Sequence, residues 1–254
     1  MSGLAATAAV SWLYDSDALS ARVVRGVFQD AERDLVRPPT PDLSHWSDKS
    51  VDFCWIGHAT VLINFYGLKV LTDPVLFDRV GASTPFGTVG RKRLVAPAIP
   101  VKKLPKLDLV LLSHAHMDHI DIPSLEALPH ATQLLTAGKT TDLAREAGFR
   151  NINELRWGEK TTLTTGAGDI SLEAFEVNHW GARWKTDSYR GYNGYLLSRG
   201  GKTLLFGGDT ALCETFKSLG ECTSQCRNRF RRGSHTKRAG RVDANDQFRQ
   251  EFAD

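Results

Sequence analysis

The strongest constraint on the fold lies at residues 111–119, LLSHAHMDH, where an apolar run leads directly into four side chains of metal-binding types. His114 and His116 are two positions apart, so at the end of an extended strand they point to the same side. Asp118 and His119 follow and can turn toward a second position close by. Because imidazole nitrogens and carboxylate oxygens together suit zinc and related divalent ions, the spacing predicts two adjacent metal sites after a buried strand.

The chain around this motif alternates between strand-like and helix-like patterns. Three short β-rich runs at 51–56, 60–65 and 68–72 predict an antiparallel meander. The stretch 73–107 is long and contains several glycines and prolines, so we predict a loop that covers a site. The apolar strand DLVLLS then precedes the metal motif. Further on, the pattern predicts helices near 123–128 and 139–147, strands near 132–136, 152–156, 161–164, 170–177, 193–198 and 202–207, and finally a loop leading into a helix.

The two ends of the chain differ from its middle. Over 16–36, apolar residues recur four apart before a pair of prolines, which predicts an amphipathic helix and makes residues 1–44 a helical extension packed on the body. Residues 222–254 hold eight Arg and Lys side chains against four acids, with few large apolar residues. We expect this basic tail to be disordered or foreign to the fold, through truncation or a shifted reading frame, and the domain to span 45–221.

Composition limits the classes of protein that this chain can join. With 41% hydrophobic residues in 254 positions, a sizeable core can form. No apolar run approaches the roughly 20 residues that span a bilayer, and the start lacks the pattern of a secretory signal, so we expect a cytoplasmic protein. The net charge of +3 traces to the basic tail, and we expect no nucleic-acid partner.

Five motifs together resemble the metallo-β-lactamase superfamily. They are WIGHATVLI at 55–63, LTDPV at 71–75, SHAHMDH at 113–119, VNHWGAR at 177–183 and FGGDT at 206–210. Within that superfamily they look like the zinc hydrolases related to N-acylphosphatidylethanolamine phospholipase D, with the ascorbate-6-phosphate lactonase-like group as the nearest neighbour. The resemblance implies an α+β fold, a four-layer αββα sandwich with metals at one edge, here lacking its last strands and helix.

The resemblance also implies roles for individual residues. One Zn²⁺ would be bound by His114, His116 and His179, and a second by Asp118, His119 and a bridging Asp209. A hydroxide held between the two metals would be the nucleophile, and Asp118 would also orient it. Two further residues are candidates for supporting roles: Asp73 either orients a ligating histidine or caps a strand end, and His58 either lines the site or stabilises a tight turn.

The family pattern includes one more histidine after the bridging aspartate. The only histidine there is His235, in the basic tail, and no strand leads into it, so we predict that it is not a ligand. The second metal site would then be weaker than the first.

The resemblance favours a phosphodiesterase of the phospholipase D type that acts on N-acylphosphatidylethanolamine-like lipids. Its partner would be a phospholipid or another small phosphodiester, with peripheral membrane contact. Aromatic residues at 180, 184, 189, 192 and 195 could line a mouth for an acyl chain or a lipid surface, although packing between strands would explain at least some of them. Two alternatives remain open: a sugar-phosphate lactonase that uses the same metals, and a truncated, catalytically weak metal-binding protein.

Overall fold

The structure is a computed structural model that describes residues 34–84, 87–184, 186–216 and 219. Two sequence-based predictions fall outside these ranges. They are the helix predicted over 16–36, except for its last three residues, and the tail at 222–254 with His235.

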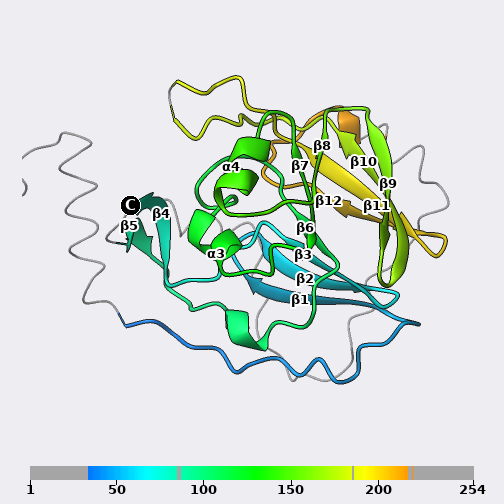
Figure 1. The fold of residues 1–254 in the computed structure, drawn as a ribbon, viewed down its shortest axis with the longest axis horizontal. Coiled ribbons are helices and arrows are strands. Elements are labelled where there is room, and N and C mark those ends of the chain that lie inside the picture. Colours follow the sequence, from blue (N-terminus) through cyan, green and yellow to red (C-terminus); the bar gives the residue numbers. More distant parts are fainter. Residues whose placement is uncertain (1–33, 85–86, 185, 217–218, 220–254) are drawn as a thin grey trace, which may run out of the picture.

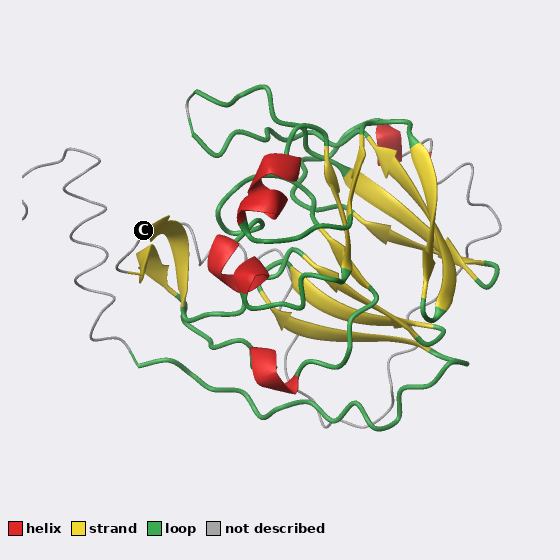
Figure 2. Cartoon of the chain, viewed as in Figure 1, coloured by secondary structure: helices red, strands yellow, loops and turns green. Residues whose placement is uncertain are grey.

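The first sheet has six strands, and the metal motif directly follows the carboxyl end of one of its interior strands (Figure 1). Its members, in spatial order, are β1 (Val51–Gly57), β2 (Thr60–Phe65), β3 (Leu68–Thr72), β6 (Leu109–Leu111), β7 (Gln133–Ala137) and β8 (Ile152–Leu155). The first three pair antiparallel, which confirms the predicted meander, whereas β3, β6, β7 and β8 run parallel. Helices α3 (Ile122–Glu126) and α4 (Thr141–Glu146) pack on one face of this sheet through an apolar cluster (Figure 2).

The second sheet packs on the other face of the first. It is antiparallel, in the order β12 (Lys202–Phe206), β11 (Gly194–Arg199), β10 (Gly168–Phe175) and β9 (Lys160–Thr165). The described residues therefore form three layers: helices, the six-stranded sheet and the four-stranded sheet. The helix predicted after the last strand is described only at Thr215, Phe216 and Leu219.

A second apolar cluster fills the space between the two sheets. It includes Phe65, Leu68 and Leu111 from the first sheet and Leu172 and Leu197 from the second, all 1% exposed or less. Each such side chain contributes about 1.5 to 3 kcal/mol through burial. Because strand side chains alternate, the same strands leave their other residues for the helices or the solvent.

Tyr195 belongs to this inner core and not to a substrate mouth. It is 0% exposed, and its hydroxyl donates a hydrogen bond to the carbonyl of Leu112 at 3.0 Å. The prediction that it lines an opening is wrong, because its position on β11 turns the ring toward the facing sheet. Aromatic residues in strands fill cores as readily as they line sites.

The stretch 73–107 contains more regular structure than the predicted loop. A hairpin of β4 (Arg79–Thr84) and β5 (Gly87–Lys92) and a 3₁₀ turn, η1 (Val101–Lys103), lie within it. Gly81 and Gly90 face each other across the hairpin, and a Cβ on Gly90 would lie 1.9 Å from the carbonyl oxygen of Val80. Strands with such close backbones lack the alternating large side chains by which a sequence pattern reveals a strand.

The predicted N-terminal helix does not extend to Val36. Asp34 to Val36 are not helical, and Val36 forms a parallel bridge with Val95. The amide of Val36 donates to the carbonyl of Leu94 at 3.1 Å, while its own carbonyl accepts from Ala96 at 2.9 Å. These bonds replace helical ones just before Pro38, which restricts the preceding residue to extended backbone.

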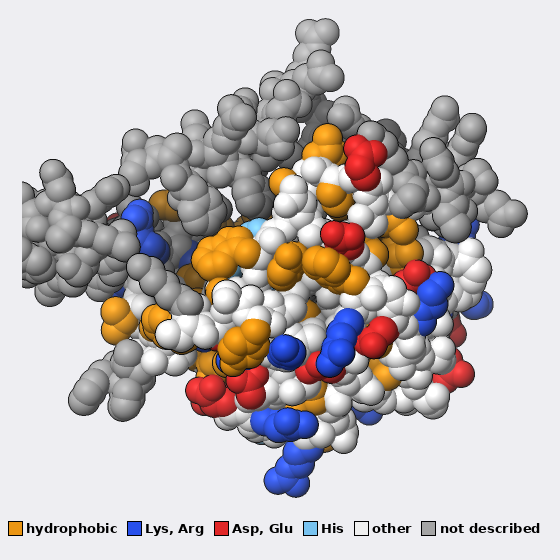
Figure 3. All heavy atoms as spheres, turned by 90° about the horizontal axis from the view of Figure 1, so that it is seen from above, with side chains coloured by type: hydrophobic (Ala, Val, Ile, Leu, Met, Phe, Trp, Pro, Cys, Tyr) orange, Lys and Arg blue, Asp and Glu red, His pale blue; other side chains and the backbone are white. Residues whose placement is uncertain are grey.

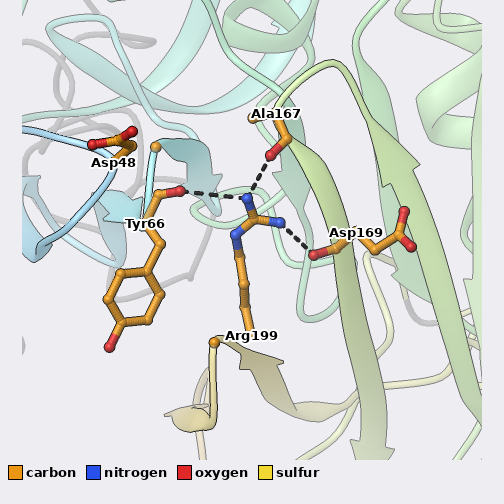
Figure 4. A pocket seen from close by; sticks show the side chains of 7 residues that line it. Asp48, Tyr66, Ala167, Asp169 and Arg199 are labelled. Carbon is orange, nitrogen blue, oxygen red and sulfur yellow. Dashed lines mark hydrogen bonds between the residues drawn. The ribbon is translucent and has the colours of Figure 1, made fainter.

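At one end of the sandwich, Arg199 ties the two sheets together through three backbone carbonyls. Its guanidinium donates hydrogen bonds to the carbonyls of Tyr66, Ala167 and Asp169, beside a surface hollow (Figure 4). Tyr66 belongs to the turn between β2 and β3, Ala167 to the turn between β9 and β10, and Asp169 to the start of β10. This contact joins the two sheets at the end opposite the metal motif, which follows the other end of β6.

Candidate metal centre

The metal motif and its predicted partners meet at one edge of the sandwich. Five loops reach this edge: the β1–β2 turn and the segments that follow β3, β6, β10 and β12. All eight residues predicted for the site lie on these loops: His58, Asp73, His114, His116, Asp118, His119, His179 and Asp209. Because both sheets end here, residues up to 151 positions apart in the chain can face one another.

Short pairings hold the loops of the second sheet in place. Asn178 forms an antiparallel bridge with Ala211, whose amide donates to the carbonyl of Asn178 at 2.9 Å. The amide of Asn178 in turn donates to the Thr210 hydroxyl at 3.0 Å. His179 and Asp209, each next to one of these residues, are therefore held together.

The first cluster consists of three imidazoles. Nε2 of His114 lies 2.8 Å from Nδ1 of His116, and Nε2 of His179 lies 3.2 Å from each of these two atoms. Ligands of a tetrahedral zinc ion, at 2.0–2.1 Å from the metal, are separated from one another by about 3.3 Å. The triangle of nitrogens therefore has the size that one divalent cation requires.

These three imidazoles are held in the neutral form. Burial lowers the pKa of His114, His116 and His179, and neighbouring imidazoles lower it further. A neutral ring has a free electron pair for a metal, whereas a protonated ring does not. The electrostatics of the cluster thus agree with its geometry.

The second cluster lies beside the first and combines a carboxylate with imidazoles. Nε2 of His58 is 3.0 Å from Oδ2 of Asp118, and Nε2 of His119 is 3.9 Å from the same oxygen. Burial raises the pKa of Asp118, but the hydrogen bond from His58 and the charge of His119 outweigh it and hold the pKa below its usual range. Asp118 is therefore ionised.

Asp209 lies between the two clusters. Its Oδ2 is 3.3 Å from Nε2 of His119 and 3.9 Å from Nε2 of His179. Although Nε2 of His119 is buried, it has no partner in hydrogen-bond geometry among the residues that the structure describes. A buried nitrogen that faces carboxylates without hydrogen bonding to them fits a metal ligand. The arrangement suits a carboxylate shared by two cations.

Asp73 orients His119 from the opposite side. It is 0% exposed and accepts hydrogen bonds from the amide and hydroxyl of Ser113, at 2.7 and 2.6 Å. Its Oδ2 lies 2.7 Å from Nδ1 of His119. Burial lowers the pKa of His119, but Asp73 and Asp209 outweigh that effect and raise it to about 10 in the metal-free chain. A carboxylate behind one ring nitrogen fixes the direction of the other.

Arg183 is a supporting residue to which the sequence pattern assigned no role. Its Nη1 donates to the carbonyls of Ala115 and Ile120, at 3.2 and 2.7 Å, and so spans the metal motif. Burial lowers the pKa of this guanidinium. The VNHWGAR motif contained the residue, but a contact with backbone carbonyls more than 60 positions away leaves no pattern in the sequence.

One exposed aromatic side chain contacts the site, and two more lie on the segment that follows His179. Trp180, Trp184 and Tyr189 are 61%, 56% and 58% exposed, and the Trp180 ring lies 4.5 Å from the ring of His116, centre to centre. Hydrophobic side chains gather beside a histidine on the face turned upward in Figure 1 (Figure 3). Tyr192, by contrast, pairs with Trp157. Only part of the predicted aromatic cluster is therefore free to meet a ligand.

Arg190 anchors the segment that carries these aromatic residues. It donates to both carboxylate oxygens of Asp142 on α4, at 2.6 and 2.8 Å, and to Asp187 at 2.6 Å. The Arg190 side chain is 8% exposed, and the Asp187 side chain is 9% exposed. Substitution of Arg190 would leave a buried carboxylate without its cation.

The Arg190→Ala variant is expected to unfold with a free energy about 2 to 3 kcal/mol below that of the parent, near the lower end for a broken buried pair because Asp142 is more than half exposed. Urea unfolding at neutral pH measures this loss. The matched control is Arg37→Ala, which removes the exposed Arg37–Asp78 pair and should change stability by less than about 1 kcal/mol. Equal losses in both variants would contradict an anchoring role.

Fold and site together define a chain of the metallo-β-lactamase type: two packed sheets with a histidine and aspartate cluster at the strand ends. The chain belongs to the Beta-lactamase superfamily domain family, whose model matches residues 69–227. This confirms the superfamily and the fold implied by the five motifs.

Several known proteins resemble the chain. It is 30% identical to N-acyl-phosphatidylethanolamine-hydrolyzing phospholipase D 1 of Caenorhabditis elegans over 69% of this chain and 51% of the worm protein, so it spans about half the length of that relative. It is 34% identical to a metal-dependent hydrolase of Thermodesulfovibrio yellowstonii, over 67% of this chain and 64% of that protein. The crystal structure of isothiocyanate hydrolase from Delia radicum gut bacteria matches with a TM-score of 0.50 and 25% identity over 67% of both chains.

One further property concerns membranes. Within the described part of the chain, no helix has the length and apolar character required to cross a bilayer.

Proposed function

We propose that this chain is a metal-dependent hydrolase that cleaves phosphodiesters, with N-acylphosphatidylethanolamine-like lipids as its substrates. The observation that carries the proposal is the pair of adjacent donor clusters with Asp209 between them. The similarity to the worm phospholipase D supports the choice of substrate. The reaction would add water across the bond between phosphorus and the N-acylethanolamine oxygen, which releases phosphatidic acid.

The donor set fits two divalent cations, and we propose zinc. His114, His116 and His179 would hold one, and Asp118, His119 and Asp209 would contribute to the other. When bound, such a pair lowers the pKa of a water molecule and neutralises charge on phosphate oxygens.

The residues of the site would position water and substrate. Asp118 is ionised and can accept a hydrogen bond from the attacking water, which orients it. Asp73 keeps His119 directed toward the site, and Arg183 keeps the backbone of the metal motif in one conformation. Precise placement of this kind accounts for much of the rate gain in hydrolases.

The exposed aromatic residues favour a lipid over a sugar phosphate. Trp180, Trp184 and Tyr189 lie on the segment that follows His179, where they would contact an acyl chain or a membrane surface. A sugar-phosphate lactone has no apolar part of comparable size. Peripheral membrane contact is therefore part of the proposal, while a cytoplasmic location remains a prediction from the sequence.

The test is turnover of lipid vesicles by the purified, zinc-loaded chain. N-acylphosphatidylethanolamine should yield phosphatidic acid and N-acylethanolamine, whereas a sugar-phosphate lactone should not be hydrolysed. The reverse preference would favour the lactonase. Full metal content without hydrolysis of either substrate would favour a silent metal-binding protein.

Metal removal is expected to abolish turnover and lower the thermal midpoint. Four imidazoles and two carboxylates would then face one another without a cation, and the binding free energy that metals add to folding is lost. Dialysis against a chelator followed by calorimetry and by the vesicle assay measures both effects. Zinc should restore them, and turnover that survives complete removal would contradict a metal-dependent reaction.

A further inference from the structure

We propose that His58 is a direct ligand of the second metal, together with Asp118 and His119. This inference rests on the proposed function, because His58 would complete the second metal site of the proposed hydrolase. It gives His58 a role beyond lining the site or stabilising a turn. Direct coordination by His58 has a geometric basis and a spectroscopic test that is separate from catalysis.

The backbone of His58 adopts an unusual conformation at the edge of the site. This residue forms the tight turn between β1 and β2 and has a φ of 54°, in the left-handed region that few residues other than glycine adopt. Its carbonyl accepts a hydrogen bond from Nε1 of Trp55 at 2.7 Å. Such a conformation costs of order 1 to 3 kcal/mol and is concentrated at functional sites. The turn thus holds the imidazole at the edge where the metal motif lies.

Donor atoms of His58, Asp118 and His119 converge on one point. One ligand atom from each of His58, Asp118 and His119 lies within 4.8 Å of the others, as in the cluster of His114, His116 and His179. The His58 side chain is 16% exposed and that of His119 is 1% exposed, so water competes little for either nitrogen. Three donors from two loops that are 60 positions apart thus form a second small cage.

Coordination to one ion and a direct hydrogen bond would place His58 and Asp118 at similar distances. The 3.0 Å between Nε2 of His58 and Oδ2 of Asp118 suits a hydrogen bond, and it is also near the roughly 3.3 Å between ligands of one tetrahedral ion. Nε2 of His119 makes no hydrogen bond among the described residues and faces Oδ2 of Asp209 at 3.3 Å and Oδ2 of Asp118 at 3.9 Å, as a ligand beside a cation site would. If a metal ion is bound, His58, Asp118 and His119 each provide one of its ligand atoms.

The decisive variant is His58→Cys loaded with Co²⁺. A thiolate bound to cobalt produces an intense ligand-to-metal charge-transfer band in the near ultraviolet, whereas a thiol that only lies nearby does not. We expect the band in His58→Cys and its absence from the parent, whose own described cysteines, Cys54 and Cys213, lie outside the clusters. The matched control is His130→Cys, since His130 contacts the Glu126 carbonyl away from the site.

Metal titration provides the second measurement. The parent should bind two Zn²⁺ per chain, and His58→Ala should keep the first and weaken the second by more than the 10- to 100-fold loss typical of a residue that only orients a ligand. His58→Asn, which can still donate a hydrogen bond to Asp118, should resemble His58→Ala. Rescue by asparagine, together with no cobalt band in His58→Cys, would overturn the inference.

Other outcomes separate this inference from the proposed function. A cobalt band with two metals per parent chain but no lipid turnover would contradict the proposed substrate and leave His58 as a ligand. Loss of the second metal in His235→Ala, with no effect of substitution at His58, would instead assign the position to the basic tail and overturn the inference.

Discussion

The His179→Ala variant is expected to lose the first metal and to hydrolyse lipid with a kcat/KM about 10²- to 10³-fold below that of the parent. His179 is the only member of the three-histidine cluster supplied by the second sheet, and its side chain is 20% exposed, so its removal should leave the fold largely unchanged. Loss of a metal removes several kcal/mol of charge stabilisation, and about 3 to 4 kcal/mol corresponds to the stated factor.

Metal content and vesicle turnover, measured on the same preparation, test this expectation. His130→Ala serves as the control because it removes a partly exposed imidazole that belongs to neither cluster. Normal turnover with one metal per chain in His179→Ala would show that the three-histidine site is dispensable. An unchanged metal content would contradict the ligand assignment itself.

The Asp73→Asn variant is expected to lose about 2 to 3 kcal/mol of stability without metal, and about 10- to 100-fold in metal affinity. Asp73 is fully buried and serves three donors on Ser113 and His119. Asparagine keeps the volume and tolerates the φ of 32° at this position, so the change isolates the negative charge. Alanine would add backbone strain to the lost charge.

The stability difference in the metal-free chain should depend on pH. The folded pKa of His119 is raised from 6.5 to about 10, so the pair stabilises fully below pH 6.5 and loses this contribution as pH rises through 10. The free energies of unfolding of the parent and of Asp73→Asn, measured with urea, should therefore differ most near pH 6 and converge at high pH. Asp108→Asn is the control. The Asp108 carboxylate accepts a hydrogen bond from the amide of Lys69, near the opposite end of β3 from Asp73, so this variant should show no such convergence.

Much of the fold could be predicted because its strands differ from their surroundings. The bounds predicted for the first three strands match those of β1 to β3 to within one residue, since glycine turns separate runs of apolar residues. The β4–β5 hairpin could not be recognised, because its strands contain facing glycines in place of large side chains. Val36 likewise pairs with Val95 through backbone groups, which carry no sequence signal.

The candidate site was predictable as a set of residues but not as a geometry. Spacing placed His114 to His119 on one loop, and resemblance added His179 and Asp209. The contact of His58 with Asp118 joins loops 60 positions apart, and the hydrogen bonds from Arg183 to the metal motif reach similarly far. Such contacts depend on how the strands are ordered in the sheet, which the sequence pattern did not provide.

The division of the donor residues between the two sheets has a consequence for the cell. The first sheet carries the metal motif, while the second carries His179 and Asp209, so bound cations would cross-link the two layers. A ligand present at 100 times its dissociation constant adds about 2.7 kcal/mol to the free energy of unfolding. The lifetime of the protein would then follow the supply of free metal, and starvation for metal would lower its abundance as well as its activity.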